Sequence, residues 1–473
     1  MHRKLIFCLF FALSYLAQGH DDDSAPRLGD TLNKTISLNE EKKIGQNIYR
    51  NLQGINYIIN DPLVHDYITY LGSRLSRNLS VERSYRFFVT KSKDVNAFAV
   101  PGGFIGINAG LINLSENEAQ LAGVVAHELG HVVLRHSAEM MANSNVNSIP
   151  MWIGIFAGLL AGQTEASITA IKSGIGLSVQ NNINLIRENE IESDNFAIDL
   201  MLKSNFDLNE MADFFKLMQG DSNNQFGANE YFMTHPLYNN RISSIRNRAQ
   251  SQNQAMKNST ADYHYIKNII SINSYNQKEL NIINDNLSIN IHKKGLKLFF
   301  NGENVSAREL LIKEYTKDKS NIYISSLLSR VSYDLKKINE SRKILEETLR
   351  IYPGNNAIKL QLYQINIKES YDVYRAVNDL NKMADENIQN PIYFKILAEG
   401  YNKLDNTYKS MISFINYYSL KGDINMAFKV IDEGVVSSKL NNTQKDYLKK
   451  LKNNILCETN PPLEPIFGDK TCN

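Results

Sequence analysis

Residues 115–142 read SENEAQLAGVVAHELGHVVLRHSAEMMA, and this stretch decides the fold of the first half of the chain. Its apolar residues recur at helical spacing, which predicts one long helix over residues 119–142. Ser115 followed three residues later by Glu118 is a capping box, so the helix is expected to begin there. The pattern HELGH, residues 127–131, then falls in the middle of this helix.

The HELGH pattern brings two imidazoles to one face of the predicted helix. Because residues four positions apart lie above one another in a helix, His127 and His131 can bind the same zinc ion. Glu128 lies beside that point and is not needed as a ligand, so it can serve as a general base. The sequence therefore predicts a helical zinc site that holds one Zn²⁺ per chain.

A catalytic zinc site needs a third protein ligand and one open position for water. His136 is the nearest candidate in the sequence, but on one continuous helix it points about 140° away from the pair. We therefore expect His136 to lie in the core or to form hydrogen bonds near the site. A carboxylate from a later segment is the alternative ligand.

An acidic segment, residues 187–194, offers that carboxylate. Glu190 and Asp194 are four positions apart and share one face of a helix. One of them can bind the metal while the other accepts a hydrogen bond from an imidazole N–H. Spacing alone leaves Glu188, Glu190 and Glu192 open as the ligand, and a solvated helix face is the alternative for each.

Short β-rich runs precede the HELGH helix at residues 85–90, 95–100 and 104–108. Pro101-Gly102-Gly103 separates the last two runs and predicts a tight turn between strands. Residues 33–80 carry apolar positions at helical spacing. The first half is therefore expected to be a mainly helical α+β domain with a small sheet.

The strand that contains Asn96, Ala97 and Phe98 is expected to lie beside the metal. A free strand edge can pair with an extended polypeptide, which recognises the backbone and tolerates many side chains. An ordinary core strand is the alternative, because strand edges are usually covered. The strand is thus a candidate binding site for unfolded protein substrates.

The second half of the chain is predicted to be all-α. Residues 246–262 are rich in Gln, Asn and Ser, which indicates an exposed connection and a domain boundary near 255. Residues 256–456 have helical periodicity, and residues 326–353 resemble one tetratricopeptide repeat that ends at Pro353. Stacked helix pairs of this kind form a binding surface, so a repeat domain that binds partners is expected.

The composition excludes several classes of protein. The chain has 473 residues, with 52 Lys+Arg and 50 Asp+Glu, and no basic stripe, so a nucleic-acid partner is not expected. Aromatic residues make up 10% and charged residues 22%, which is typical of a globular chain rather than a disordered one.

Residues 1–19 are predicted to be a removed signal peptide. Arg3 and Lys4 precede an apolar run of about 13 residues, which is too short to span a bilayer, and small residues follow it. The expected protease domain is then residues 20–255, and no transmembrane anchor is expected. Cys457 and Cys472 remain in the mature chain, and they are predicted to form a disulfide within a C-terminal tail, residues 457–473.

Several segments together resemble the family of the CAAX prenyl proteases and the heat-shock membrane protease HtpX. Their order and spacing match that family over roughly residues 35–250. The segments are HELGH at 127–131, NAFAVPGG at 96–103, EIESD at 190–194, Thr234-His235-Pro236 and Arg241.

The resemblance implies a specific set of site residues. The metal ligands would be His127, His131 and Glu190, and Asp194 would accept a hydrogen bond from an imidazole. Ser193 stands where the family has Ala, and both residues are small, so the helix is not put in doubt.

The resemblance also implies a peptidase mechanism. A zinc ion would activate water and stabilise the oxyanion, while Glu128 would accept the proton and return it to the leaving nitrogen. His235 and Arg241 would assist nearby. His235 could instead occupy the open position and hold the enzyme latent.

A leader, no membrane span and a repeat domain narrow the resemblance to the periplasmic branch of that family in Gram-negative bacteria. This branch implies an endopeptidase for misfolded or stalled outer-membrane β-barrel proteins, with the repeats binding the client or the barrel assembly machinery. Two alternatives remain: a chaperone or adaptor whose zinc site is mostly silent, and a metalloaminopeptidase that requires a free substrate N-terminus.

Overall fold

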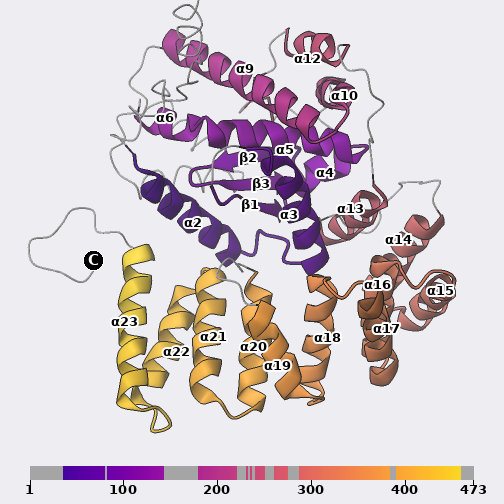
Figure 1. Cartoon of the computed structure of the whole chain (residues 1–473), viewed down its shortest axis with the longest axis vertical. Coiled ribbons are helices and arrows are strands. Elements are labelled where there is room, and N and C mark those ends of the chain that lie inside the picture. Colours follow the sequence, from indigo (N-terminus) through magenta and orange to yellow (C-terminus); the bar gives the residue numbers. More distant parts are fainter. Residues whose placement is uncertain are drawn as a thin grey trace, which may run out of the picture.

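The structure is a computed structural model, and it describes residues 36–79, 83–142, 179–220, 231–232, 235–236, 240–250, 260–274, 287–383 and 390–459. Figure 1 shows a small sheet among helices in the N-terminal half and a row of helices below it, in this view, in the C-terminal half. The predicted fold class, a mainly helical α+β half followed by an all-α half, is confirmed. The predicted signal peptide lies outside the described residues, as does Cys472.

Three strands form the sheet: β1 (Arg86–Thr90), β2 (Ala97–Val100) and β3 (Phe104–Asn108). Their order is β1-β3-β2, with β3 parallel to β1 and antiparallel to β2. The turn between β2 and β3 contains Gly102 and Gly103, whose φ angles of +81° and +90° favour glycine. The predicted turn between two strands is therefore confirmed.

The helix with the HELGH pattern is α5 (Glu118–Val133), and its start differs from the prediction. Its N-cap is Asn117, whose side chain accepts a hydrogen bond from the backbone N–H of Gln120. The predicted cap, Ser115, instead follows the short helix α4 (Ala109–Leu114), and its hydroxyl bonds to the Tyr263 hydroxyl at 2.8 Å. The capping-box prediction was wrong because a tertiary contact takes that hydroxyl.

The end of α5 also differs from the prediction of one helix to residue 142. The helix stops at Val133, and Arg135 has a φ of +63°, which a continuing helix cannot contain. A second helix, α6 (His136–Ala142), begins directly afterwards. The break changes the direction of every side chain that follows it.

Helix α5 packs against the sheet on one side and against α9 (Val179–Lys203) and α10 (Leu208–Gly220) on the other (Figure 1). A Cβ atom at Gly130 would lie 3.0 Å from Cα of Ser193 on α9. Small residues on both helices therefore allow the close approach that the site requires. Helices α2 (Leu38–Gly54) and α3 (Pro62–Ser76) also contact strands of the sheet.

The C-terminal half consists of helices that pack on their neighbours in sequence. The predicted repeat at 326–353 coincides with one helix pair, in which the hydroxyls of Ser329 and Ser341 lie 2.8 Å apart in the core. None of the described helices is both long and apolar enough to cross a bilayer. Helix α12 (Arg241–Ala249) is the last described helix before the predicted boundary. The helices that follow it are α13 (Ala261–Ser274), α14 (Leu287–Phe300), α15 (Asn304–Lys317), α16 (Ile322–Asp334), α17 (Ile338–Ile351), α18 (Asn356–Lys368), α19 (Val373–Met383), α20 (Pro391–Lys403), α21 (Thr407–Leu420), α22 (Ile424–Val436) and α23 (Asn442–Thr459).

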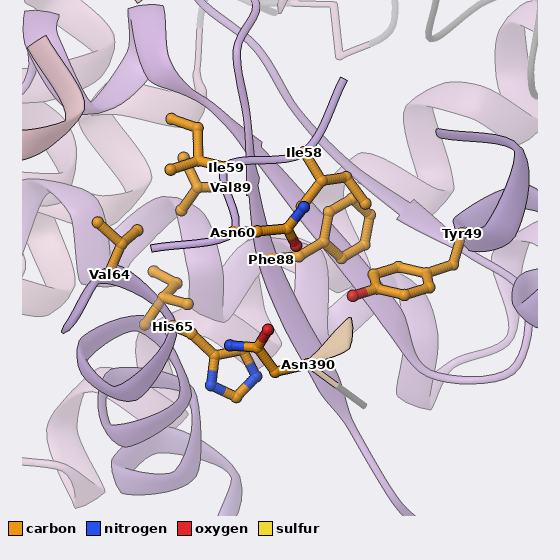
Figure 2. Close-up of a pocket in the computed structure, with 10 residues that line it drawn as sticks. Tyr49, Ile58, Ile59, Asn60, Val64, His65, Phe88, Val89 and Asn390 are labelled. Atoms are coloured by element: carbon orange, nitrogen blue, oxygen red, sulfur yellow. The ribbon is translucent and has the colours of Figure 1, made fainter. Parts of the chain in front are cut away.

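The two halves meet at α2, α3 and α4. The carboxylate of Asp66 on α3 accepts a hydrogen bond from the backbone N–H of Ala357 in α18 at 3.1 Å. Figure 2 shows a small pocket nearby, lined by residues of α2, α3 and β1, by residues 58–60 between the two helices, and by Asn390 of the second half. None of the predicted site residues lines this pocket. The domain boundaries and the tetratricopeptide assignment stay predictions, because residues 251–259 lie outside the described part.

Candidate metal centre

Four side chains with metal-binding atoms meet inside the N-terminal half. His127 and His131 extend from α5, Glu190 extends from α9, and His235 lies in the segment before α12. One ligand atom from each lies within 4.8 Å of the corresponding atoms of the others. The structure thus brings His127 and His235 together although they are 108 residues apart in the sequence.

The spacing of these atoms fits a tetrahedral metal ion. Nε2 of His127 and Nε2 of His131 are 3.1 Å apart, and Glu190 oxygens lie 3.4 Å from the first and 3.3 Å from the second. Ligand atoms bonded at about 2.1 Å to a tetrahedral zinc lie about 3.4 Å from one another. The donor set of two imidazoles and a carboxylate is also one that zinc prefers.

The structure distinguishes among the acidic residues that spacing left open. The Glu190 side chain is buried against the two imidazoles, whereas Glu188 and Glu192 are exposed on α9. Burial raises the pKa of Glu190, but His235 and His127 outweigh burial and hold that pKa well below its usual range. Glu190 is therefore an ionised carboxylate that faces the imidazoles.

Asp194 and Arg241 form the layer behind the imidazole of His127. Oδ1 of Asp194 lies 3.0 Å from Nδ1 of His127, and Arg241 donates to both oxygens of this carboxylate, at 2.6 and 2.8 Å. Arg241 also places Nη1 at 2.7 Å from Glu190. Burial lowers the pKa of Arg241, but Asp194 outweighs burial and raises it. Arg241 thus holds two carboxylates in place.

His235 completes the cluster. Its Nδ1 lies 3.0 Å from Glu190 Oε1 and 3.4 Å from His127 Nε2. Its ring stacks on Tyr231, with ring centroids 4.8 Å apart, which restricts its orientation. His235 is therefore placed where it could bind the metal as a fourth ligand, and it also lies beside Glu128.

Glu128 has no exposed surface and faces the same space. Neither of its carboxyl oxygens has a hydrogen-bond partner within the described residues, and Nε2 of His235 lies 3.4 Å from Oε1. Burial raises the pKa of Glu128. A buried carboxyl without a partner, beside a set of metal ligands, is suited to exchange protons with water or substrate.

Residues 62–249 match the model of peptidase family M48. The chain carries an M48 peptidase domain. All the residues predicted for the metal site lie inside the matched range. The predicted family resemblance is confirmed, and so is the prediction of a metallopeptidase.

The chain is also similar to several relatives along most of its length. The chain is 26% identical over 442 residues to the β-barrel assembly-enhancing protease of Escherichia coli K12, covering 89% of both chains. It is 28% identical over 388 residues to the corresponding protease of Yersinia pestis, covering 80% of this chain and 74% of that one. It is 27% identical over 214 residues to the mitochondrial metalloendopeptidase OMA1 of Schizosaccharomyces pombe, covering 44% and 61%.

The predicted substrate strand lies beside the HELGH helix of the M48 domain. β2 is an edge strand of the described sheet, because its one strand neighbour is β3, and it packs on α5. Ala97 is buried, Phe98 is half-buried, and Asn96 directly precedes the strand. Binding of an unfolded chain to this strand stays a prediction.

His136 is buried and forms a hydrogen bond near the site, as expected, although the single continuous helix assumed for its direction was wrong. On a continuous helix it would point away from the metal site of the M48 domain, but the break at Arg135 turns it back, and its Nδ1 lies 2.9 Å from Nδ1 of His131. No local pattern signals this break, since Arg135 is not a residue type that favours positive φ. Thr234, the first residue of the predicted Thr-His-Pro motif, lies outside the described residues.

Proposed function

We propose that this chain is a periplasmic zinc metalloendopeptidase that cleaves misfolded or stalled outer-membrane β-barrel proteins. The observation that carries the proposal is the buried cluster of His127, His131 and Glu190 with the unpartnered carboxyl of Glu128 beside it. The client class is supported by relatives named β-barrel assembly-enhancing proteases, which match 89% of the chain.

The side chains supply most of the chemistry that peptide hydrolysis needs. Zinc bound by His127, His131 and Glu190 would supply a Lewis acid that activates water and polarises the peptide carbonyl. Glu128 accepts a proton from the attacking water and returns it to the leaving nitrogen, and its raised pKa suits both steps. Asp194 holds the His127 ring so that its Nε2 faces the site.

The first experiment compares the purified chain with Glu128→Gln. Unfolded casein and an unfolded outer-membrane β-barrel protein serve as substrates, and zinc content is measured by elemental analysis. We expect cleavage by the unchanged chain and a loss of about 10²- to 10⁴-fold in the variant, with zinc retained. Equal cleavage by both proteins, or a strict need for a free substrate N-terminus, would contradict the proposed endopeptidase.

A latent state is a second proposal, and the position of His235 favours it. Its Nδ1 lies as close to Glu190 and His127 as a fourth ligand would, so it would block the position that water needs. In this state the chain would act mainly as a chaperone or adaptor of outer-membrane protein assembly.

Replacement of His235 by Ala tests the latch. We expect faster casein cleavage with zinc retained, whereas His65→Ala, on α3 and outside the cluster, should leave the rate unchanged. An unchanged or slower rate for the His235 variant, with zinc retained, would count against the latch.

The repeat half is proposed to bind the client or the barrel assembly machinery, and the leader to direct the chain to the periplasm. An oxidising compartment would also allow the Cys457 and Cys472 disulfide. Mass spectrometry of proteins captured by Glu128→Gln in cells identifies the clients directly. Recovery of cytosolic proteins alone would contradict both the location and the client class.

A further inference from the structure

The second metal-binding imidazole, His131, has its own partner on the side away from the cluster. Nδ1 of His136 lies 2.9 Å from Nδ1 of His131, and the two rings meet edge to face with centroids 5.0 Å apart. His136 is buried. The contact therefore joins the one ring nitrogen of His131 that the cluster does not use.

The protonation of both rings follows from this contact. His131 faces His127 and Glu190 through Nε2, so metal binding requires a lone pair there and a proton on Nδ1. That Nδ1–H must donate to Nδ1 of His136, which then carries its own proton on Nε2. Nε2 of His136 lies 3.4 Å from Glu192, whose carboxylate can accept a hydrogen bond from this Nε2–H group.

An unusual backbone conformation places His136 there. Arg135 has a φ of +63°, a region that residues other than glycine rarely adopt, and this break brings the following residue back toward His131. The Arg135 side chain donates to Glu41 at 2.7 Å and to the carbonyl of Ile36 at 2.7 Å. The start of α2 therefore holds the break in place from outside the helix.

Helix α9 supports the same residue. Oγ of Ser193 lies 3.3 Å from Nδ1 of His136, and Glu192 is its neighbour in sequence. Glu190, the carboxylate of the cluster, is on the same helix three residues before Ser193. A shift of His136 would therefore disturb the His131 ring and the helix that carries Glu190.

We propose that His136 is a positioning residue for the metal site: it accepts the Nδ1–H of His131 and so fixes the tautomer and the orientation of that imidazole. This inference rests on the proposed zinc site and adds a residue that the HExxH pattern does not contain. Outer partners of this kind contribute about 10- to 100-fold to metal affinity.

The test compares His136→Asn with His136→Gln. The side-chain oxygen of Asn reaches the place of Nδ1, whereas the amide of Gln reaches the place of Nε2, so the acceptor toward His131 is kept in the first variant and lost in the second. Zinc affinity is measured by competition with a chromophoric chelator at one pH. Thermal unfolding of the metal-free proteins reports packing, and His292→Leu serves as a control at a buried histidine outside the site.

We expect His136→Asn to bind zinc nearly as tightly as the unchanged chain and His136→Gln to bind about 10- to 100-fold more weakly. In zinc-loaded protein labelled with ¹⁵N-histidine, the Nδ1–H signal of His131 should persist in the Asn variant and exchange rapidly with water in the Gln variant. Equal zinc affinity in both variants overturns the inference, as does equal loss in both. If the unchanged chain binds no zinc, the proposed function itself fails.

Discussion

Each half of the molecule buries histidine, but the surroundings of the buried rings differ. In the M48 domain, His127 faces the carboxylates of Glu190 and Asp194, which outweigh burial and raise its pKa to about 9. In the C-terminal half, His292 packs against the rings of Tyr265 and Tyr323, and burial lowers its pKa to about 3. Burial alone therefore does not indicate a site, whereas buried imidazoles that face buried carboxylates do.

The difference extends to how polar groups are satisfied. In the C-terminal half, the hydroxyl of Ser329 forms a hydrogen bond with that of Ser341, and Arg342 donates to Asn366 at 2.7 Å. These contacts fix the packing of the helices. In the M48 domain, both oxygens of Glu128 lack a hydrogen-bond partner among the described residues. Substitutions in the M48 domain should therefore change zinc binding and proteolysis, whereas substitutions in the C-terminal half should change only the stability of the chain.

Glu190→Gln should have the largest effect, and this effect should be confined to the metal site of the M48 domain. The amide keeps the shape of the carboxylate but loses its charge, so zinc binding and proteolysis should fall to background. The metal-free variant should still unfold cooperatively, because the helix that carries residue 190 keeps its packing. Elemental analysis and a casein assay measure the effect.

His292→Leu is the matched change in the C-terminal half. It removes a buried imidazole that has no carboxylate partner among the described residues, so zinc content and cleavage of casein should stay at the level of the unchanged chain. Retention of one zinc ion by Glu190→Gln would show that the cluster is not the metal site.

Zinc should stabilise the chain by a smaller, concentration-dependent amount. A ligand that binds only the folded state at 100 times its dissociation constant adds about 2.7 kcal/mol to the free energy of unfolding. We expect the unfolding temperature of the chain to rise with added zinc and to fall in chelator. Differential scanning calorimetry measures this shift.

The same titration separates the two halves. His292→Leu should show the full zinc-dependent shift, whereas Glu190→Gln should show none. A zinc-dependent shift of equal size in Glu190→Gln would mean that the metal binds elsewhere, and the contrast between the halves would fail.

Local sequence patterns predicted the parts of the site that depend on local geometry. The pair His127 and His131 needs only a helix, and the turn at Gly102 and Gly103 needs only residues that accept positive φ. The choice of Glu190 over its neighbours was not predictable from spacing, because it depends on how α9 is rotated against α5. The family resemblance supplied that choice.

Contacts between distant residues decided the parts that the sequence did not predict. The hydroxyl of Ser115 bonds to Tyr263, so Asn117 caps α5 instead. The break at Arg135 depends on Glu41, which lies 94 residues earlier. Both errors arose because tertiary hydrogen bonds competed with a local helix signal.

The smallest effect expected is a change in acid stability from His292. Its pKa in the folded chain is about 3, and its ordinary value in an unfolded chain is about 6.5. Between these values the unfolded state binds one more proton, so His292 lowers the free energy of unfolding by up to about 1.4 kcal/mol for each pH unit below about 6.5. The folded state keeps its full stability above about pH 6.5, where the ring is neutral in both states, and loses stability as the pH falls toward 3. Urea unfolding of metal-free protein at pH 7.5 and 5.5 should therefore show a smaller loss of stability in His292→Leu than in the unchanged chain. An equal loss in both proteins would mean that the ring is charged or solvated in the folded state, and the contrast with His127 would then rest on the carboxylates alone.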